Sequence, residues 1–182
     1  MNRENRLRLW SIQANTACEW LEKNGVLQTP WSQTPLNWRP AYRWMTNEMH
    51  LQDIDLQDFA PIWAWHSCNG VLQAPPTLGI ARNLLSDLQI IEGCCVVEFD
   101  APASLCLLSS YQRFNELLDV FLDDKNAQPQ REDFLDMFTM HPIDEYDSIQ
   151  AALPRIDMEW VRDIRSLEMK PDSIDYDWNA PI

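Results

Sequence analysis

The stretch PIWAWHSCNG (61–70) decides the fold, because it packs alternating apolar and aromatic residues into one short segment. In a β-strand, successive side chains point to opposite faces. One face carries Ile62, Ala64, His66 and Cys68, and the other carries Trp63, Trp65 and Ser67. Both faces hold apolar groups, so we expect a central strand that is covered on both sides and ends in an Asn69–Gly70 turn. His66 is then expected to be a buried, hydrogen-bonded histidine.

Other elements follow on either side of this strand. Strands are predicted at 7–13, 94–100, 149–156 and 161–169, and a short strand is predicted to lead into a helix within 105–124. Helices are predicted at 14–25, 38–49 and 131–138. We expect Asn15 or Thr16 to cap the first helix and Gly25 to end it, and Ser109 or Ser110 to cap the helix within 105–124. The buried face of that last helix is expected to hold Phe114, Leu117, Leu118, Phe121 and Leu122.

These elements indicate an α+β fold. We expect a single domain over 1–182, with a mixed or antiparallel sheet of about five or six strands and three to five surrounding helices. Residues 170–182 are predicted to form an acidic tail that lies on the surface.

The net charge of −14 lies almost entirely in the second half of the chain. Residues 1–91 hold 7 basic and 8 acidic side chains, whereas residues 92–182 hold 7 and 20. Such a surface repels nucleic acid and anionic membranes, and it attracts basic proteins. Acidity can also serve solubility alone. The partner-binding candidates are Asp119, Asp123, Asp124, Glu132, Asp133, Asp136, Asp144, Glu145 and Asp147.

The sequence contains no strong catalytic or metal-binding motif. No P-loop, G-x-G-x-x-G, G-x-S-x-G or H-E-x-x-H occurs, and His66 with Cys68 and the adjacent Cys94 and Cys95 does not match zinc-ligand spacing. We therefore expect no metal. An odd count of five cysteines without a visible secretory signal predicts reduced, buried thiols and a cytoplasmic protein. No apolar run is long enough to span a bilayer.

The order of several motifs resembles an uncharacterised bacterial family, the domain of unknown function 3841 family. LWSIQ, PAYRWM and PIWAWHSCNG resemble that family's LWTIQ, AYDWM and PIWAWY motifs, and VVEFDAPASLCLLS and SIQAALPRIDMEW follow in the family's order. The resemblance runs from Leu9 to about Met169. Ser109-Ser110-Tyr111 and Pro154-Arg155 depart from the family's S-D-F and W-E. The family name implies no activity.

A looser similarity links LWSIQ, the helix ending in KNGVL and the strand VVEFDAP to small ADP-ribosyltransferase-like domains. This similarity implies an NAD pocket in which Gln13 and Glu98 are catalytic and Trp65 and His66 bind the cofactor. Glu98 and Asp100 share one strand face, which could equally be a solvated face opposite a core of Val97 and Phe99.

Two functions therefore remain. The first is a non-enzymatic, acidic interaction protein without a cofactor. It would bind a basic, nucleic-acid-handling protein complex by charge mimicry, as an inhibitor from a phage or mobile element would. The second is an ADP-ribosyltransferase-like NAD-binding enzyme or a degenerate relative of one.

Overall fold

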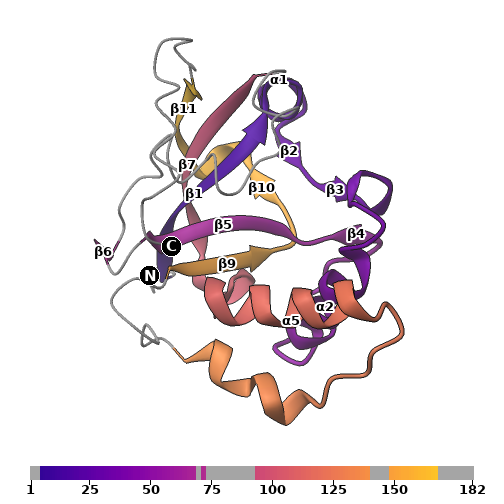
Figure 1. Cartoon of the computed structure of the whole chain (residues 1–182). Coiled ribbons are helices and arrows are strands. Elements are labelled where there is room, and N and C mark those ends of the chain that lie inside the picture. Colours follow the sequence, from indigo (N-terminus) through magenta and orange to yellow (C-terminus); the bar gives the residue numbers. More distant parts are fainter. Residues whose placement is uncertain (1–4, 69–70, 73–92, 140–147, 168–182) are drawn as a thin grey trace, which may run out of the picture.

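The computed structural model describes residues 5–68, 71–72, 93–139 and 148–167, and its architecture is α+β. The main sheet is antiparallel, with strand order β11-β7-β1-β5-β9-β8, and β6 pairs with β5 outside this path (Figure 1). Its strands are β1 (Arg6–Ala14), β5 (Ile62–Cys68), β6 (Val71–Leu72), β7 (Cys94–Pro102), β8 (Leu107–Ser110), β9 (Ile149–Leu153) and β11 (Val161–Leu167). The predicted fold class, a single α+β domain around an antiparallel sheet, is confirmed.

The helices and two small sheets complete the described part of the chain. The α-helices are α1 (Asn15–Asn24), α2 (Arg39–His50) and α5 (Tyr111–Asp123). The 3₁₀ helices are η1 (Trp31–Gln33), η2 (Ala103–Leu105), η3 (Arg131–Phe138) and η4 (Met158–Trp160). The small sheets pair β2 (Val26–Leu27) with β10 (Ile156–Asp157), and β3 (Thr29–Pro30) with β4 (Phe59–Ala60). Within the described residues, no helix has the length and apolar character needed to cross a membrane.

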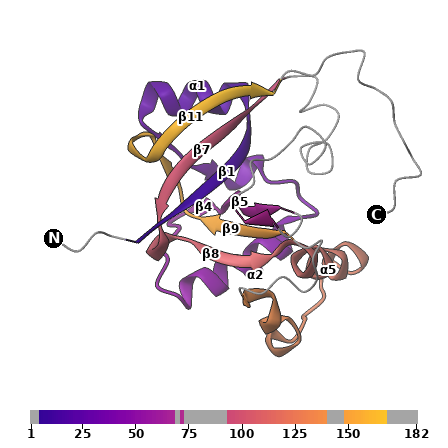
Figure 2. The same cartoon turned by 90° about the vertical axis from the view of Figure 1, so that its left-hand side faces the viewer.

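The central position predicted for PIWAWHSC is correct. β5 lies between β1 and β9, and both of its faces are buried. Ile62 and Ala64 join Leu9 and Val97 in a core beneath α1, on what we call the α1 face of the sheet. Trp63 points to the opposite side, the α5 face, where α2 and α5 pack (Figure 2).

The core of the α5 face is aromatic. The Trp63 ring lies 4.4 Å from the Phe114 ring and 5.3 Å from the Tyr42 ring, measured between centroids. Phe114, Leu117 and Phe121 form the buried stripe of α5, at the helical spacing that the sequence predicted. Ser110 caps this helix by accepting a hydrogen bond from the Arg113 backbone N–H, as expected.

Several local predictions need correction. The N-cap of α1 is Ala14, without a side-chain cap, so neither Asn15 nor Thr16 caps it, although Gly25 ends the helix in the left-handed conformation (φ 81°). Leu122 is exposed, because it lies on the flank of α5 that faces away from the sheet.

The pairing of β5 with β9 is irregular between Trp65 and Ser67. This irregularity breaks the alternation, so Cys68 packs with Trp65 rather than with Ile62 and Ala64. The predicted Asn69–Gly70 turn and the tail at 170–182 lie outside the described residues.

Candidate functional site

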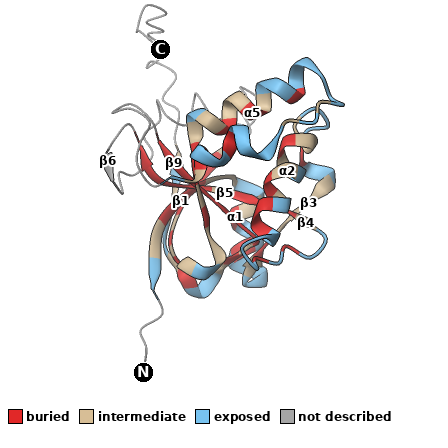
Figure 3. Ribbon diagram, turned by 90° about the horizontal axis from the view of Figure 1, so that it is seen from below, coloured by how far each residue is buried: buried red, intermediate tan, exposed pale blue. Residues whose placement is uncertain are grey.

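Six of the nine predicted partner-binding acids lie on α5, on η3 or at the end of α5, and all six are exposed (Figure 3). We call this set the acidic surface: Asp119, Asp123, Asp124, Glu132, Asp133 and Asp136. The other three candidates, Asp144, Glu145 and Asp147, lie outside the described residues. Residues 111–139 hold seven acidic and three basic side chains, so this part of the surface is negative even after its internal ion pairs are counted.

Arg113 fixes η3 against α5. Its guanidinium donates to Asp136 Oδ1 at 3.0 Å and to the Asp133 carbonyl oxygen at 2.7 Å, and it also pairs with Glu116. The same group lies 5.2 Å from the centre of the Phe134 ring. In contrast, Asp119, Asp123 and Asp133 form no ion pair within the described part of the chain. These three carboxylates are therefore available to an external cation.

The acidic surface also carries exposed apolar side chains. Val120 and Leu122 lie on α5 and Leu135 lies on η3, and each is more than a third exposed. Exposed apolar groups among charges are the chemical mixture found where a protein surface binds another protein. The sequence pattern had assigned Leu122 to the core, so this contribution to the surface was not foreseen.

A second candidate site is a row of side chains that crosses the sheet. The strand register places Asp163 opposite Glu98, Glu98 opposite Trp10, and Trp10 opposite Trp65. The row continues from Trp65 to Gln150 and from Gln150 to Ser109. We call it the transverse row: Asp163, Glu98, Trp10, Trp65, Gln150 and Ser109. Directly paired residues share a face, so the row lies on the α5 face.

Along the transverse row, the side chains change from charged and partly exposed on β11 and β7 to buried on β1, β5, β9 and β8. Trp10, Trp65, Gln150 and Ser109 are buried, whereas Glu98 is partly exposed and Asp163 is half exposed. The Gln150 amide donates to Ser109 Oγ at 3.3 Å, and the Trp65 ring contacts the Tyr111 ring at 4.8 Å. The buried Trp10 indole N–H has no hydrogen-bond acceptor in the described structure. Sequence reasoning missed Trp10 and Gln150, because only strand register brings them beside Trp65. It also missed Tyr111, because the packing of the first turn of α5 places that ring there.

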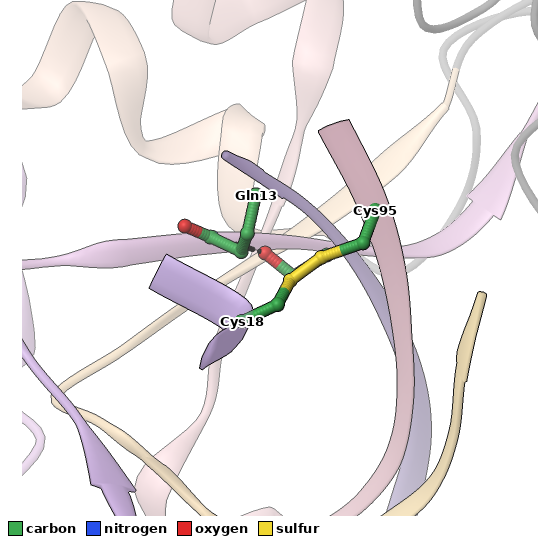
Figure 4. The surroundings of a disulfide bond; sticks show 4 residues. Gln13, Cys18 and Cys95 are labelled. Carbon is green, nitrogen blue, oxygen red and sulfur yellow. Dashed lines mark hydrogen bonds between the residues drawn. A yellow bond between two sulfur atoms is a disulfide. The ribbon is translucent and has the colours of Figure 1, made fainter. Parts of the chain in front are cut away.

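Gln13, the proposed partner of Glu98, lies on the other side of the sheet. Gln13 pairs with Cys95 on β7, and the Gln13 side chain lies beside the Cys18–Cys95 disulfide on the α1 face (Figure 4). Its amide donates to Ser11 Oγ at 2.7 Å. The structure thus brings Trp65 and Glu98 to either side of Trp10, and it does not bring Gln13 to them.

His66 is buried, as predicted, but its Nδ1 atom has no hydrogen-bond partner among the described residues. The expected hydrogen bond is therefore missing at this nitrogen in the part of the chain that the structure describes. His66 lies within the irregular stretch of β5, where the ladder to β9 is interrupted. Burial lowers the pKa of His66, because the charged imidazolium is poorly solvated there.

Glu98 and Asp100 belong to a network of arginines on β1 and β11. Arg8 and Arg165 lie 3.6 and 3.5 Å from the Glu98 carboxylate. Arg162 Nε donates to Asp100 Oδ2 at 2.7 Å. Hydrogen bonds from Arg162, and secondarily from Arg8, hold the pKa of Asp100 below its usual value. These two carboxylates therefore lie on a partly exposed, ion-paired face, with Val97 and Phe99 in the core behind them.

The cysteines depart from the prediction of reduced thiols. Cys18 on α1 and Cys95 on β7 form a disulfide, whereas Cys68 and Cys106 are free thiols. Sequence alone could not pair them, because 77 positions separate the two partners. The described residues contain no group of three or more His, Cys, Asp or Glu side chains that could hold a metal ion.

Comparison with protein-family models, with curated proteins and with solved structures finds no match to this chain.

Proposed function

We propose that this protein is a binding module whose acidic surface engages a basic protein. Six carboxylates are exposed on α5, at its end and on η3, and all but Asp136 form no ion pair within the described residues; this observation carries the proposal. Carboxylates of this kind attract lysine and arginine side chains over a long range and accelerate association at low salt. The partner is then a protein with a basic patch.

The partner's basic patch is of the kind that otherwise holds nucleic acid. A surface of carboxylates spaced along a helix presents a series of negative charges, as a phosphate backbone does, without being a nucleic acid. Val120, Leu122 and Leu135 would add apolar contact where the charges alone bind weakly. In this role the protein inhibits a nucleic-acid-handling complex by occupying its basic groove, as an inhibitor from a phage or mobile element would.

The test combines capture and charge removal. The protein is used as bait in a bacterial lysate and washed at about 0.1 M and then at about 1 M salt, and bound proteins are identified by mass spectrometry. We expect a basic protein that is held at low salt and released at high salt. Equal retention at both salt concentrations would contradict charge mimicry.

A matched pair of variants then locates the surface. Asp119→Asn/Asp123→Asn/Asp133→Asn removes three charges that form no internal ion pair, so the fold should persist. The control, Glu19→Gln/Glu22→Gln/Asp58→Asn, removes the same charge from exposed positions outside the acidic surface. Loss of the captured partner in the first variant alone supports the proposal. Equal binding by both variants would place the interface elsewhere.

A second candidate function is NAD binding, with or without transfer. The observation in its favour is that Trp65 and Glu98 flank Trp10 on one face of the sheet. Glu98 is the partly exposed member of the three, and its carboxylate can accept a hydrogen bond from a ribose hydroxyl beside the buried Trp10 and Trp65 rings. Gln13 takes no part in this version, because its side chain lies on the α1 face beside the Cys18–Cys95 disulfide.

Isothermal titration calorimetry with about millimolar NAD tests this second candidate. Binding heat that disappears in Glu98→Gln, but persists in Asp163→Asn, would support it. Absence of heat with the unmodified protein would reject it.

A further inference from the structure

A covalent bond joins α1 to β7, the strand next to the edge strand β11 of the sheet. Cys18 lies one turn into α1, and Cys95 lies near the start of β7, where it pairs with Gln13 of β1. The two sulfur atoms are bonded, and the residues are 5% and 3% exposed. Both belong to the core of the α1 face. The bond therefore links the helix to the strand that lies between β1 and β11.

The other cysteines are unsuited to exchange with this pair. Cys94 is adjacent to Cys95 in sequence, but successive residues of a strand point to opposite faces, so Cys94 points away from α1. Burial raises the pKa of Cys68 to about 11 and that of Cys106 to about 12. Few of their thiols are ionised at neutral pH, and the thiolate is the form that attacks a disulfide. The structure pairs Cys18 with Cys95, and the raised pKa values of Cys68 and Cys106 disfavour attack of their thiols on this bond.

We propose that Cys18–Cys95 is a reversible redox crosslink that controls how firmly α1 is held on the sheet. The oxidant is a small-molecule disulfide such as oxidised glutathione. One cysteine thiolate attacks it and releases one glutathione thiol, and the second cysteine then displaces the other glutathione from the mixed disulfide. Two protein thiols are oxidised and one glutathione disulfide is reduced to two thiols. Excess reduced glutathione drives the same steps backwards.

Burial makes this exchange dependent on movement of α1. Neither sulfur is open to solvent in the closed structure, so the helix must lift from the sheet before glutathione can reach the bond. Leu21 and Cys18 are the buried residues of α1, and its hydrophobic anchorage is therefore small. With the bond closed, α1 and β7 cannot separate. With the bond open, only packing holds the helix.

The crosslink is independent of the proposed interaction with a basic partner. α1 lies on the opposite face of the sheet from α5 (Figure 1). Failure of the redox test would therefore leave the acidic surface untouched, and failure of the partner test would leave the crosslink untouched.

The experiment is a redox titration of the whole protein. The protein is equilibrated in glutathione buffers of graded oxidised-to-reduced ratio and then trapped by alkylation, and peptide mass mapping identifies the bonded cysteines. Urea denaturation is measured at both ends of the series. We expect one Cys18–Cys95 bond that forms and opens along the series, with a lower urea midpoint in the reduced protein, because a crosslink over a long loop limits the unfolded chain.

Variants separate this bond from general effects of oxidation. Cys18→Ala should abolish the dependence of the urea midpoint on redox conditions, whereas Cys94→Ala should retain it. The titration of the unmodified protein is decisive if Cys18→Ala does not fold. A bond between other cysteines, a pair that stays reduced in every buffer, or a bond that survives excess reduced glutathione in the native protein would each overturn the proposal.

Discussion

Arg131 forms a two-point ion pair with Glu48 and so joins η3 to α2 across 83 positions of sequence. Arg131 Nε lies 2.7 Å from Glu48 Oε1, and Nη2 lies 2.9 Å from Oε2. Glu48 is 5% exposed, so its carboxylate depends on this guanidinium for solvation. η3 is therefore held at two points, to α2 by the Arg131–Glu48 pair and to α5 by Arg113.

Arg131→Gln should destabilise the fold more than its modest burial suggests, because it leaves the Glu48 carboxylate buried without a cation. Thermal denaturation should show a lower midpoint than for Lys125→Gln, which removes the same charge from an exposed loop. Addition of Glu48→Gln to Arg131→Gln should recover part of the loss. A double variant less stable than Arg131→Gln alone would contradict this account.

Two leucines on α5 should differ sharply when truncated. Leu117 is fully buried, so Leu117→Ala should cost about 2–5 kcal/mol of unfolding free energy through lost burial and a cavity. Leu122 is 45% exposed, so Leu122→Ala should change stability by no more than ~0.5 kcal/mol. Urea denaturation measures both. Equal losses would mean that α5 does not pack on the sheet through the Leu117 side.

Leu122→Ala also bears on binding. If the exposed apolar side chains contribute to the interface, this variant should weaken capture of the basic partner while keeping the stability of the unmodified protein. Unchanged capture would confine the interaction to the charges.

The sequence pattern located most of the elements, because their physical causes are local. Gly25 ends α1, Ser110 caps α5, and the period-two pattern of 61–68 makes β5 a buried strand. Features that depend on distant partners were not predictable in this way. The disulfide, the Glu48–Arg131 pair and the transverse row all join residues whose proximity is set by strand register or helix packing.

The irregularity in β5 shows why a candidate site is harder to predict than a strand. Strict alternation placed His66 and Cys68 on one face, but the interrupted pairing between Trp65 and Ser67 changes which residues share a face. The register shifts by one position only, and this shift places Cys68 on the side of the sheet that holds Trp10 and Trp65.

His66 should make stability depend on pH. Burial holds its folded-state pKa below the unfolded value of 6.5, so the unfolded chain binds the proton more readily. The stabilising contribution is complete above the unfolded pKa, and it is lost as the pH falls from the unfolded pKa towards the folded one. We expect urea midpoints to decrease between about pH 7.5 and 5.5.

His66→Gln should make this pH dependence shallower, whatever its effect on stability at neutral pH. His50→Gln is the control, because it removes a histidine that is exposed at the end of α2 rather than buried in the sheet. An identical slope in His66→Gln and the unmodified protein would assign the pH dependence to other groups.

Asp100 should respond to the loss of a single arginine. Hydrogen bonds from Arg162 and Arg8 lower the pKa of Asp100 in the folded protein. The ionised Asp100 therefore stabilises the fold at pH values above its pKa in the unfolded chain, and this stabilisation is lost as the pH falls through its pKa in the folded protein. Arg162→Gln removes the larger cause and should raise the Asp100 pKa towards its ordinary value. Carbon-detected NMR of the side-chain carboxyl during an acid titration measures this pKa directly.

Arg155→Gln breaks the ion pair with Asp157, outside the network of β1, β7 and β11, so it should leave the Asp100 titration unchanged. An Asp100 pKa that does not move in Arg162→Gln would show that Arg8 alone sustains the shift, and Arg8→Gln would then become the variant that raises it.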